Sequence, residues 1–504
     1  MKSSFYHLMS IAAIVSLAAG CAKDIPVESV SVEPETLTLA VGETSSLTVT
    51  VVPEDADYVL AFTSSNESVA TVSEEGVVEA LSDGTATITV EAGNFSAKCE
   101  VTVIVPTLDV SPAVESVSFE GVRTRTQEFT VTTTASEWTA EPDADWLSIE
   151  YTEDGFILKA AANLSMEDSR EASVTISAEG FDPIVIPVSQ QEMRMYIAGN
   201  DNSVACYWFN GAKTEVGEAN TWLSNLAVEK DGTVHCVGRQ GMGQSIAAYW
   251  SEELGWNTFQ PYDYCLGNAS GVAIDDETGD VYFTAYYYWS ESAVTTTVAG
   301  YHKNLVWEPI TTDELGSYAG IGDIIIENGN IYISFEENGV SYYSVNGERH
   351  ELELAGTKNY ASSMYVKNGD VYIGGRYTTE VDGSTIFAPC YWKNGEAVLV
   401  PVVEYAQAYA IFVDDEANVY LAGSKGPGLD RCAAYWKNDE PAVELSSYSN
   451  GVATSIYVVD DNIIVVGYQG AYPDNTSLRY WIDGEETIIT DGSTSCAGET
   501  AVII

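Results

Sequence analysis

The amino-acid sequence predicts an all-β protein in which two N-terminal β-sandwich domains are followed by a seven-bladed β-propeller. The chain has 504 residues, more than one hydrophobic core usually serves. It contains 41 glycines, 31 tyrosines and 11 tryptophans without tracts rich in Ala, Leu, Glu and Lys, which favours strands over helices. From Met195 onward a unit of short apolar segments recurs seven times, which indicates a repeat architecture.

Residues 1–20 have the pattern of an export signal. Lys2 precedes an apolar run from Leu8 to Ala19 that is too short to span a bilayer. The letters LAAGC at 17–21 resemble the lipobox of bacterial lipoproteins, which implies that Cys21 carries acyl chains and that the membrane is contacted through this lipid anchor alone. A plain secretory peptide is the alternative.

The residues after Cys21 bear on localisation. Residues 22–24, AKD, partly resemble the Lys-plus-acid signal that directs lipoproteins of Bacteroidetes to the cell surface. The resemblance implies an outer-membrane protein, lipid-anchored and exposed at the cell surface, with the periplasm as the alternative.

Residues 25–104 are predicted to form the first β-sandwich. Apolar and polar residues alternate with period two, and turn signals stand at VGE, EEG and SDG. The segments VSVEPETLTLAVGETSSLTV and SSNESVATVSEEGVVEALSDGTATITV resemble the bacterial immunoglobulin-like group 2 domain. That resemblance implies an Ig-like stalk unit, and a spacer is favoured over a ligand-binding role.

Residues 105–192 are predicted to form the second, also Ig-like, β-sandwich. The order Trp138, Trp146, Asn163, Arg170 and Gln190 resembles the BACON domain, for which a carbohydrate-binding role has been proposed. A spacer role is at least as plausible here. Trp146 lies in an apolar, strand-like run, which favours a core position over an exposed platform.

Three short sequence motifs, here called phrases, recur along residues 193–504. A phrase of the type GDVYIGG occurs seven times, and each copy is followed by a phrase of the type CYWKNG or a decayed form of it. One large residue marks each copy of the second phrase, and successive marker residues are 41 to 52 positions apart. They are Trp208, Trp250, His302, Tyr343, Trp392, Trp436 and Trp481. We therefore expect a strand at each phrase, and we interpret the KNG and KND letters as a hairpin turn.

A third element of small and β-branched residues precedes most GDVYIGG-type phrases. Its seventh copy, ETAVII at 499–504, lies some three hundred residues after the phrase at Met195 that it should accompany. Pairing between these distant segments would close the repeats into a ring and leave fewer open strand edges. With a fourth strand in each unit this predicts seven blades, and six or eight remain alternatives if His302 or Tyr343 marks an irregular unit.

The candidate ligand-binding residues lie in loops that vary between units. Variable loops on a constant scaffold commonly carry function, and aromatic rings beside acids and amides suit sugars. For each single residue, packing between blades is an equally good interpretation. The candidates are Trp222, Tyr264, Tyr286, Tyr287, Tyr288, Trp289, Tyr318, Tyr360, Tyr405 and Tyr472.

Composition excludes some functions and disfavours others. The formal net charge of -54 repels phosphate backbones, so no nucleic-acid partner is expected. Seven cysteines besides Cys21 show no CxxC pair and mostly lie in apolar runs, which predicts small buried residues.

We expect no metal and no cofactor, because acid-rich turns such as DDETGD supply too few converging oxygen ligands. No residues form a recognisable catalytic motif, so catalysis is not expected.

The function expected from the sequence is that of a non-catalytic surface lipoprotein whose propeller binds a glycan in nutrient capture. An adhesin that binds a protein or a host surface is the first alternative. A glycan-active hydrolase or lyase is the second, because acids are abundant and a catalytic pair would be distant in sequence.

Overall fold

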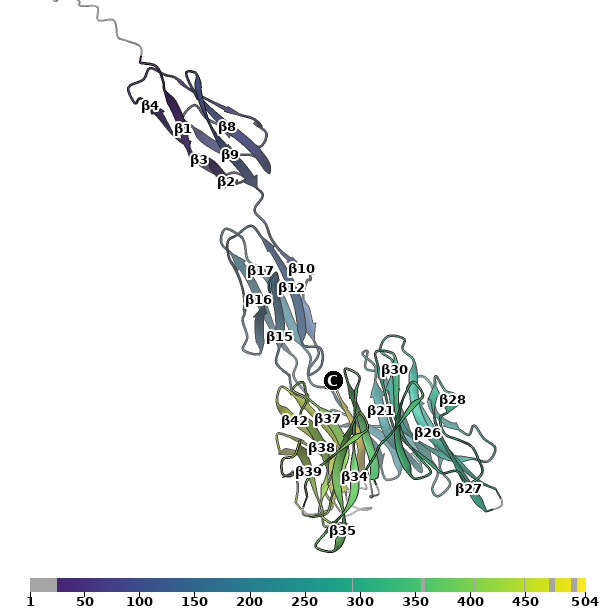
Figure 1. Ribbon diagram of the computed structural model, residues 1–504. Coiled ribbons are helices and arrows are strands. Elements are labelled where there is room, and N and C mark those ends of the chain that lie inside the picture. Colours follow the sequence, from purple (N-terminus) through teal and green to yellow (C-terminus); the bar gives the residue numbers. More distant parts are fainter. Residues whose placement is uncertain are drawn as a thin grey trace, which may run out of the picture.

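The computed structural model describes residues 25–291, 293–354, 359–402, 404–447, 449–470, 476–490 and 496–504. Over these ranges the regular structure consists of strands, which confirms the all-β prediction. No helix capable of crossing a membrane is found among them. Figure 1 shows three bodies in succession from the N-terminus: two narrow sandwiches and a wider body built from the repeats.

The first sandwich packs a four-stranded sheet, ordered β2-β9-β8-β5, against a three-stranded sheet, ordered β3-β7-β6, and a β1-β4 pair. Alternate residues of β8 and β9, such as Ile88 and Val101, are buried and meet in one core, as period-two patterning requires. The strands are β1 (Ser29–Glu33), β2 (Thr36–Ala40), β3 (Thr44–Ser46), β4 (Thr48–Val52), β5 (Leu60–Ser64), β6 (Ala70–Val72), β7 (Val77–Ala80), β8 (Gly84–Ala92) and β9 (Phe95–Ile104).

The second sandwich consists of two four-stranded sheets, ordered β10-β12-β15-β14 and β11-β17-β16-β13. Its core contains Phe129 stacked on Phe156 at 5.1 Å between ring centroids, with Trp138 against the same Phe156. The strands are β10 (Leu108–Ser111), β11 (Val117–Phe119), β12 (Thr126–Thr133), β13 (Trp138–Pro142), β14 (Leu147–Tyr151), β15 (Gly155–Ala160), β16 (Arg170–Ala178) and β17 (Ile184–Gln190).

The repeats form seven four-stranded antiparallel sheets, which we number 1 to 7 along the chain. In sheets 2 to 7 the strands pair in chain order, so each sheet is a simple meander. Sheet 1 comprises β18 (Met195–Asp201), β19 (Val204–Phe209), β20 (Ala212–Ala219) and β45 (Cys496–Ile503); sheet 2, β21 (Thr221–Val228), β22 (Val234–Gln240), β23 (Ile246–Ser251) and β24 (Gly255–Phe259); sheet 3, β25 (Leu266–Ile274), β26 (Val281–Glu291), β27 (Val294–Lys303) and β28 (Val306–Pro309); sheet 4, β29 (Ala319–Glu327), β30 (Asn330–Glu337), β31 (Val340–Val345) and β32 (Glu348–Glu351); sheet 5, β33 (Asn359–Lys367), β34 (Asp370–Val381), β35 (Ser384–Lys393) and β36 (Glu396–Leu399); sheet 6, β37 (Ala406–Val413), β38 (Val419–Lys425), β39 (Cys432–Lys437) and β40 (Val443–Glu444); and sheet 7, β41 (Val452–Val459), β42 (Asn462–Gly470), β43 (Thr476–Ile482) and β44 (Glu485–Ile488).

Sheet 1 is assembled from both ends of the repeat region. β45 pairs antiparallel with β18, and Met195 lies opposite Ile503. This confirms the predicted pairing between the phrase at Met195 and the last copy of the small-residue element. β45 also contacts β21 of sheet 2 and β41 of sheet 7, while the first strands of sheets 2 to 7 each contact the first strand of the next sheet.

Large side chains of the CYWKNG-type phrase fill the space between neighbouring sheets. Trp208, Trp392, Trp436 and Trp481 are fully buried. His302 replaces tryptophan in sheet 3, where its Nε2 bonds the hydroxyl of Tyr287 at 2.8 Å. Burial lowers the pKa of His302 to about 4, so the ring is neutral at physiological pH. Six cysteines are buried as predicted: Cys99, Cys206, Cys236, Cys265, Cys390 and Cys432.

Sheet 4 corrects one detail of the repeat alignment. Ser344, which is buried, pairs with Ile333 as Trp392 pairs with Ile373. Ser344 and Trp392 also stand two residues before the turn asparagine of their sheets. Tyr343 is therefore not the counterpart of the tryptophan, because the serine occupies that position.

The asparagine of the phrase fixes the turn between the third and fourth strands. Asn394 has a φ of 51°, and its side-chain Oδ1 accepts a hydrogen bond from the amide of Val371 at 2.8 Å. Its own amide donates to the carbonyl of Val371, also at 2.8 Å. The same pair of bonds recurs at Asn210, Asn304, Asn346, Asn438 and Asp483. The KNG and KND letters are thus turn residues, as predicted.

Candidate functional site

The seven sheets have two unlike sides. The connections between first and second strands and between third and fourth strands lie on one side, which we call the turn side. The remaining connections lie on the opposite side, the loop side. The hairpins β26-β27 and β34-β35, whose tips belong to the loop side, extend away from the second sandwich in Figure 1.

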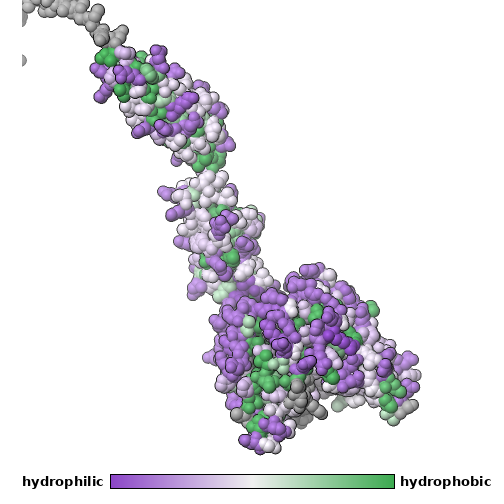
Figure 2. All heavy atoms as spheres, viewed as in Figure 1, coloured by the Kyte–Doolittle hydropathy of each residue, from purple (hydrophilic) through white to green (hydrophobic). Residues whose placement is uncertain are grey.

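The second sandwich is attached to the turn side. Arg125 makes two hydrogen bonds with the carboxylate of Asp460, at 2.7 and 2.8 Å, and the amide of Ala162 donates to the same carboxylate at 2.6 Å. The amide nitrogen of Asn210, Nδ2, donates to the carbonyl of Met166 at 3.0 Å. The loop side therefore points away from both sandwiches, and in Figure 2 the repeats next to the second sandwich present mostly hydrophilic residues.

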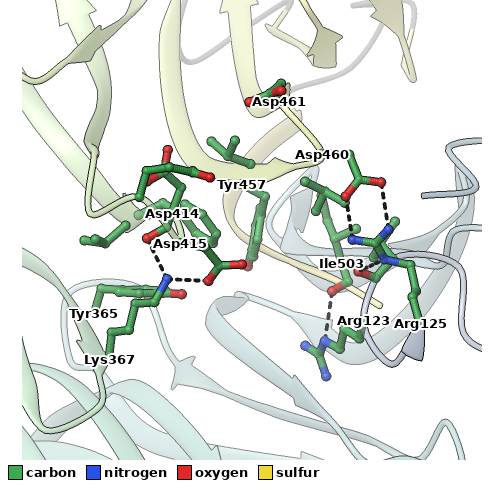
Figure 3. A pocket seen from close by; sticks show the side chains of 16 residues that line it. Arg123, Arg125, Tyr365, Lys367, Asp414, Asp415, Tyr457, Asp460, Asp461 and Ile503 are labelled. Carbon is green, nitrogen blue, oxygen red and sulfur yellow. Dashed lines mark hydrogen bonds and ion pairs between the residues drawn. The ribbon is translucent and has the colours of Figure 1, made fainter. Parts of the chain in front are cut away.

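A cavity of about 560 Å³ lies at this junction on the turn side. Figure 3 shows Lys367 directed at Asp415, with the ammonium 2.7 Å from the carboxylate, and Arg123 donating to the carbonyl of Ile503 at 3.2 Å. Asp414 is held by the amide of Asn418 and the hydroxyl of Tyr420. The charged groups that line this cavity bond to residues of the turns and of the domain junction. They therefore have a structural role, and the cavity is not a candidate ligand site.

A second cavity, of about 500 Å³, is lined by residues from the first strand of every sheet and by Arg123. Asp323 of β29 borders it, with Oδ1 3.5 Å from Nδ2 of Asn225 and Oδ2 3.4 Å from the amide of Met364. Asp323 is partly buried where it lines the cavity, and this burial raises its pKa to about 6. Ser363 also lines this cavity. Its hydroxyl oxygen, Oγ, is buried without a hydrogen-bond partner in the described part of the chain.

On the loop side, one position of the second strand differs from sheet to sheet. It follows the last residue of the GDVYIGG-type phrase, which is glycine or alanine in every sheet except sheet 4, where it is Phe335. Its side chain stands beside the start of the neighbouring first strand. We call these residues the variable ring positions. They are Asn200, Arg239, Tyr286, Glu336, Arg376, Ser424 and Tyr468.

The glycine before several variable ring positions has a steric cause. The first strand bulges there, with a register shift between Ala361 and Ser363 in sheet 5. A Cβ on Gly375 would stand 2.1 Å from the carbonyl oxygen of Tyr360, which excludes any larger residue. The bulge and the glycine thus bring the two strands close together just before the variable residue.

Two variable ring positions hold arginines stacked on aromatic rings. The guanidinium of Arg376 lies 4.9 Å from the centroid of Tyr360 and 5.2 Å from that of Phe387. Arg239 lies 4.9 Å from the ring of Trp222. Such cation–π contacts contribute about 0.5–2 kcal/mol and hold the guanidinium plane in place.

The aromatic group around Arg376 extends to neighbouring sheets. Tyr405 packs edge-on to Phe387 at 5.4 Å, and Tyr318, 55% exposed, lies near Tyr360. Burial raises the pKa of Tyr318, and the charges of Glu336, Tyr286 and Tyr360 add to the rise, so these three groups are within electrostatic reach of Tyr318. The pKa of Glu336 is also raised by burial. An arc of aromatic, cationic and acidic groups thus crosses sheets 3 to 6.

Sheet 3 adds a polar edge to this arc. Asn268 donates from Nδ2 to the hydroxyl of Tyr286, and its Oδ1 is buried without a hydrogen-bond partner among the described residues. Tyr288 stacks on Tyr286 with centroids 6.3 Å apart. This edge therefore offers an unused acceptor next to two rings.

The predicted ligand-binding residues lie in different places in the structure. Tyr286, Tyr318, Tyr360 and Tyr405 belong to the arc, Tyr288 lies beside it and Trp222 stacks on Arg239 in sheet 2. The prediction was wrong for Tyr287, which is fully buried because alternate residues of β26 face the core. Its ring makes a T-shaped contact with Trp307, with centroids 4.7 Å apart.

The other candidates stand apart from the arc. Trp289 is half-buried against Tyr262 at 4.8 Å, and Tyr264 is 96% exposed with a φ of 58°. Tyr472 and the lipidation residue Cys21 lie outside the described residues.

Sequence analysis missed the charged members of the site, Arg239, Glu336, Arg376 and the neighbouring Arg431. A signal for three of them exists in the repeat itself. When the seven GDVYIGG-type phrases are aligned, the position after the small residue reads N, R, Y, E, R, S and Y, whereas the preceding positions stay apolar or small. A position that varies inside an otherwise constant phrase is free of the packing that fixes its neighbours.

Comparisons with known proteins identify one part of the chain. No curated protein matches it. Among solved structures, TolB from Acinetobacter baumannii is 9% identical over 60% of this chain and 77% of its own, with a TM-score of 0.32. An acylaminoacyl peptidase from Pyrococcus horikoshii is 11% identical over 65% and 52%, with a TM-score of 0.34. Domains 5-6 of the S-layer protein SbsC are 14% identical over 32% and 97%, with a TM-score of 0.15.

TM-scores this low carry no argument about the whole chain. Residues 26–103, in contrast, match the family described as bacterial Ig-like domain (group 2). These residues coincide with the first sandwich, β1 to β9. The N-terminal domain is therefore a bacterial Ig-like domain of group 2.

Proposed function

We propose that this protein is a non-catalytic surface lipoprotein whose repeat region binds a glycan on its loop side. The observation that carries the proposal is the arc on the loop side. Tyr286, Glu336 and Arg376 are unlike residues at one repeated position, and the rings of Tyr318 and Tyr360 lie on the same side. Aromatic rings stack on the apolar faces of sugars, while amide, carboxylate and guanidinium groups bond their hydroxyls.

The scaffold of the proposal is a closed seven-bladed β-propeller formed by the seven sheets. It is supported by the pairing of β45 with β18 and by the contacts of β45 with the first strands of sheets 2 and 7. The cavity lined by the first strand of every sheet is what a closed ring would have along its axis. Closure would leave few open strand edges.

The two sandwiches act as a stalk in this proposal. In the second, BACON-like sandwich, Trp138 packs on Phe156 and Tyr151, and Trp146 is covered by the guanidinium of Arg170 at 4.4 Å. These tryptophans are engaged in packing, which favours a spacer over a second sugar platform. A lipid on Cys21 would hold the chain at the outer membrane, and the stalk would carry the loop side outward.

An array of neutral and charged glycans, probed with the full-length protein, tests the proposal. We expect specific retention of a glycan and at least a tenfold loss of affinity in Tyr318→Ala and Tyr360→Ala, because stacking contributes about 1 kcal/mol or more per ring. Tyr58→Ala is the matched control, since Tyr58 is a partly exposed tyrosine of the first sandwich.

Three outcomes contradict the proposal in different ways. Retention of no glycan would overturn it and favour a protein or host-surface partner. Equal affinity in the wild type and both loop-side variants would place the site elsewhere. Release of reducing ends or unsaturated products would make the protein a glycan-active enzyme.

A further inference from the structure

Basic residues in the repeats are few, and most are neutralised. Eight of them have a nitrogen within 3.3 Å of a carboxylate oxygen: Lys213, Lys230, Lys303, Arg349, Lys367, Lys393, Lys425 and Arg479. Five others, Arg194, Arg239, Arg376, Arg431 and Lys437, make no such pair with any residue that the structure describes. Three of them, Arg239, Arg376 and Arg431, lie on the loop side, although the chain carries a net charge of -54.

Arg376 is held in place and yet chemically unused. Tyr360 and Phe387 support its guanidinium, and its Nε is buried without a hydrogen-bond partner in the described ranges. A guanidinium stacked on rings keeps its N–H groups pointing outward from its edge. A buried donor without an acceptor is unfavourable by about 1–3 kcal/mol, so the hydrogen bonds of this guanidinium are not all satisfied within the protein.

A second cation stands near Arg376. Arg431 donates from Nε to Oδ1 of Asn450 at 2.9 Å. Tyr405 packs edge-on to Phe387, the ring on which Arg376 also stacks. Burial raises the pKa of Tyr405, and the charges of Arg376 and Arg431 act against that rise, so both cations are within electrostatic reach of Tyr405. Two guanidinium groups without carboxylate partners therefore share one corner of the loop side.

We propose that this corner receives the oxyanion of an acidic saccharide, a sugar bearing a carboxylate or a sulfate ester, with Arg376 as the binding residue. The inference rests on the proposed glycan binding and names the class of glycan. The guanidinium fork matches a planar carboxylate or two sulfate oxygens with parallel hydrogen bonds, and Tyr360 and Tyr405 border the space for the sugar ring.

Calorimetric titration of the full-length protein with matched glycan pairs tests the inference. The carboxylate pair is an oligogalacturonate and its methyl ester, and the sulfate pair is a sulfated galactan oligosaccharide and its desulfated form. We expect at least tenfold tighter binding of the acidic member of one pair, and which pair shows it distinguishes the two oxyanions.

Variants assign the effect to the residue. Arg376→Gln should abolish the preference for the acidic member, so that the ratio of the two affinities falls to about one. Arg376→Lys should restore part of the preference, because it keeps the charge without the fork. Lys437→Gln is the matched control, since it removes a cation stacked on Tyr420 at 5.4 Å on the turn side.

Failure of the inference is separable from failure of the proposed function. Equal binding of acidic and neutral members overturns the inference and leaves glycan binding intact. An acidic preference that persists in Arg376→Gln also overturns it as assigned. Binding of no saccharide at all overturns both.

Discussion

Single residues in the repeats separate into those that maintain the scaffold and those that differ between copies. Trp392 and Asn394 are scaffold residues, because equivalents in other sheets make the same contacts. Asp323 is different: its counterparts in the neighbouring first strands are Gly271 of β25 and Ser363 of β33, and neither is acidic. Its carboxylate stands among polar but uncharged neighbours, with Arg123 in the same lining.

The first prediction concerns the pH dependence that Asp323 causes. Its folded pKa, about 6, lies above the ordinary value of 3.8, so the folded state holds the proton more tightly and this contribution to stability is lost as the pH rises from 4 through 6. Asp323→Asn should therefore raise the free energy of unfolding by about 2 kcal/mol at neutral pH and by almost nothing at pH 4.

Urea denaturation at the two pH values measures this difference. Asp182→Asn, at an exposed position of the second sandwich, is the control and should give no comparable gain. Equal stabilities of wild type and Asp323→Asn at neutral pH would show that the carboxylate is compensated in the folded protein.

At this scale the sequence reveals core positions better than site positions. In the repeated phrase, at least one residue of each adjacent Tyr–Trp pair could be assigned to packing, because successive side chains of a strand face opposite sides. Tyr287 could not be separated from Tyr286 and Tyr288, because a run of similar aromatic residues hides which ones face inward. Arg376 could not be recognised as unpaired, because that depends on carboxylates distant in sequence.

At the scale of elements, the sheets share two local devices: a first-strand bulge in all seven, and an asparagine or aspartate turn in six of them. The bulge lies opposite glycine or alanine of the second strand in six sheets, as at Gly375, and opposite Phe335 in sheet 4. The turn uses the left-handed conformation of asparagine together with its side-chain carbonyl. Both devices recur, so repetition in the sequence predicted strand order and hairpins well, although the bulge itself has no distinct sequence signal.

The second prediction tests the asparagine turn. Asn394→Ala should lower the free energy of unfolding by about 1–2 kcal/mol, because it removes the acceptor for the Val371 amide and places alanine at φ 51°. Asn394→Gly should recover only the conformational part. Thermal denaturation followed by circular dichroism provides the comparison.

Asn368 offers a matched control for that experiment. It has a φ of 54° in the turn between β33 and β34, but its side chain makes no hydrogen bond with any described residue. Asn368→Ala should therefore be less destabilising than Asn394→Ala. Equal losses in the two variants would mean that the side-chain hydrogen bond contributes nothing.

The whole molecule combines three bodies whose order the sequence predicted, through changes in repeat pattern at about residues 105 and 193. It did not predict how the second sandwich meets the repeats. That junction depends on Arg125 and Asp460, which are 335 positions apart and carry no mutual signal in a single sequence. Burial acts to raise the pKa of Asp460, but the hydrogen bonds from Arg125 and Ala162 lower it.

The third prediction concerns this junction. Arg125→Ala should loosen the second sandwich and broaden the distribution of overall dimensions in small-angle X-ray scattering, because it removes both bonds to Asp460. Glycan affinity should stay unchanged, since the site is on the opposite side. Lys159→Ala, which breaks an ion pair within the sandwich, is the control, and identical scattering of all three proteins would contradict the prediction.

The pairing of β45 with β18 has a consequence for biosynthesis. β18 emerges from the ribosome early, but its partner on one side is made only after sheets 2 to 7 have been synthesised. Until then β18 has an unsatisfied edge that is open to wrong partners, including the same edge of another nascent chain. Premature termination anywhere before Cys496 would make that exposure permanent, so incomplete chains would carry a built-in mark for aggregation or proteolysis.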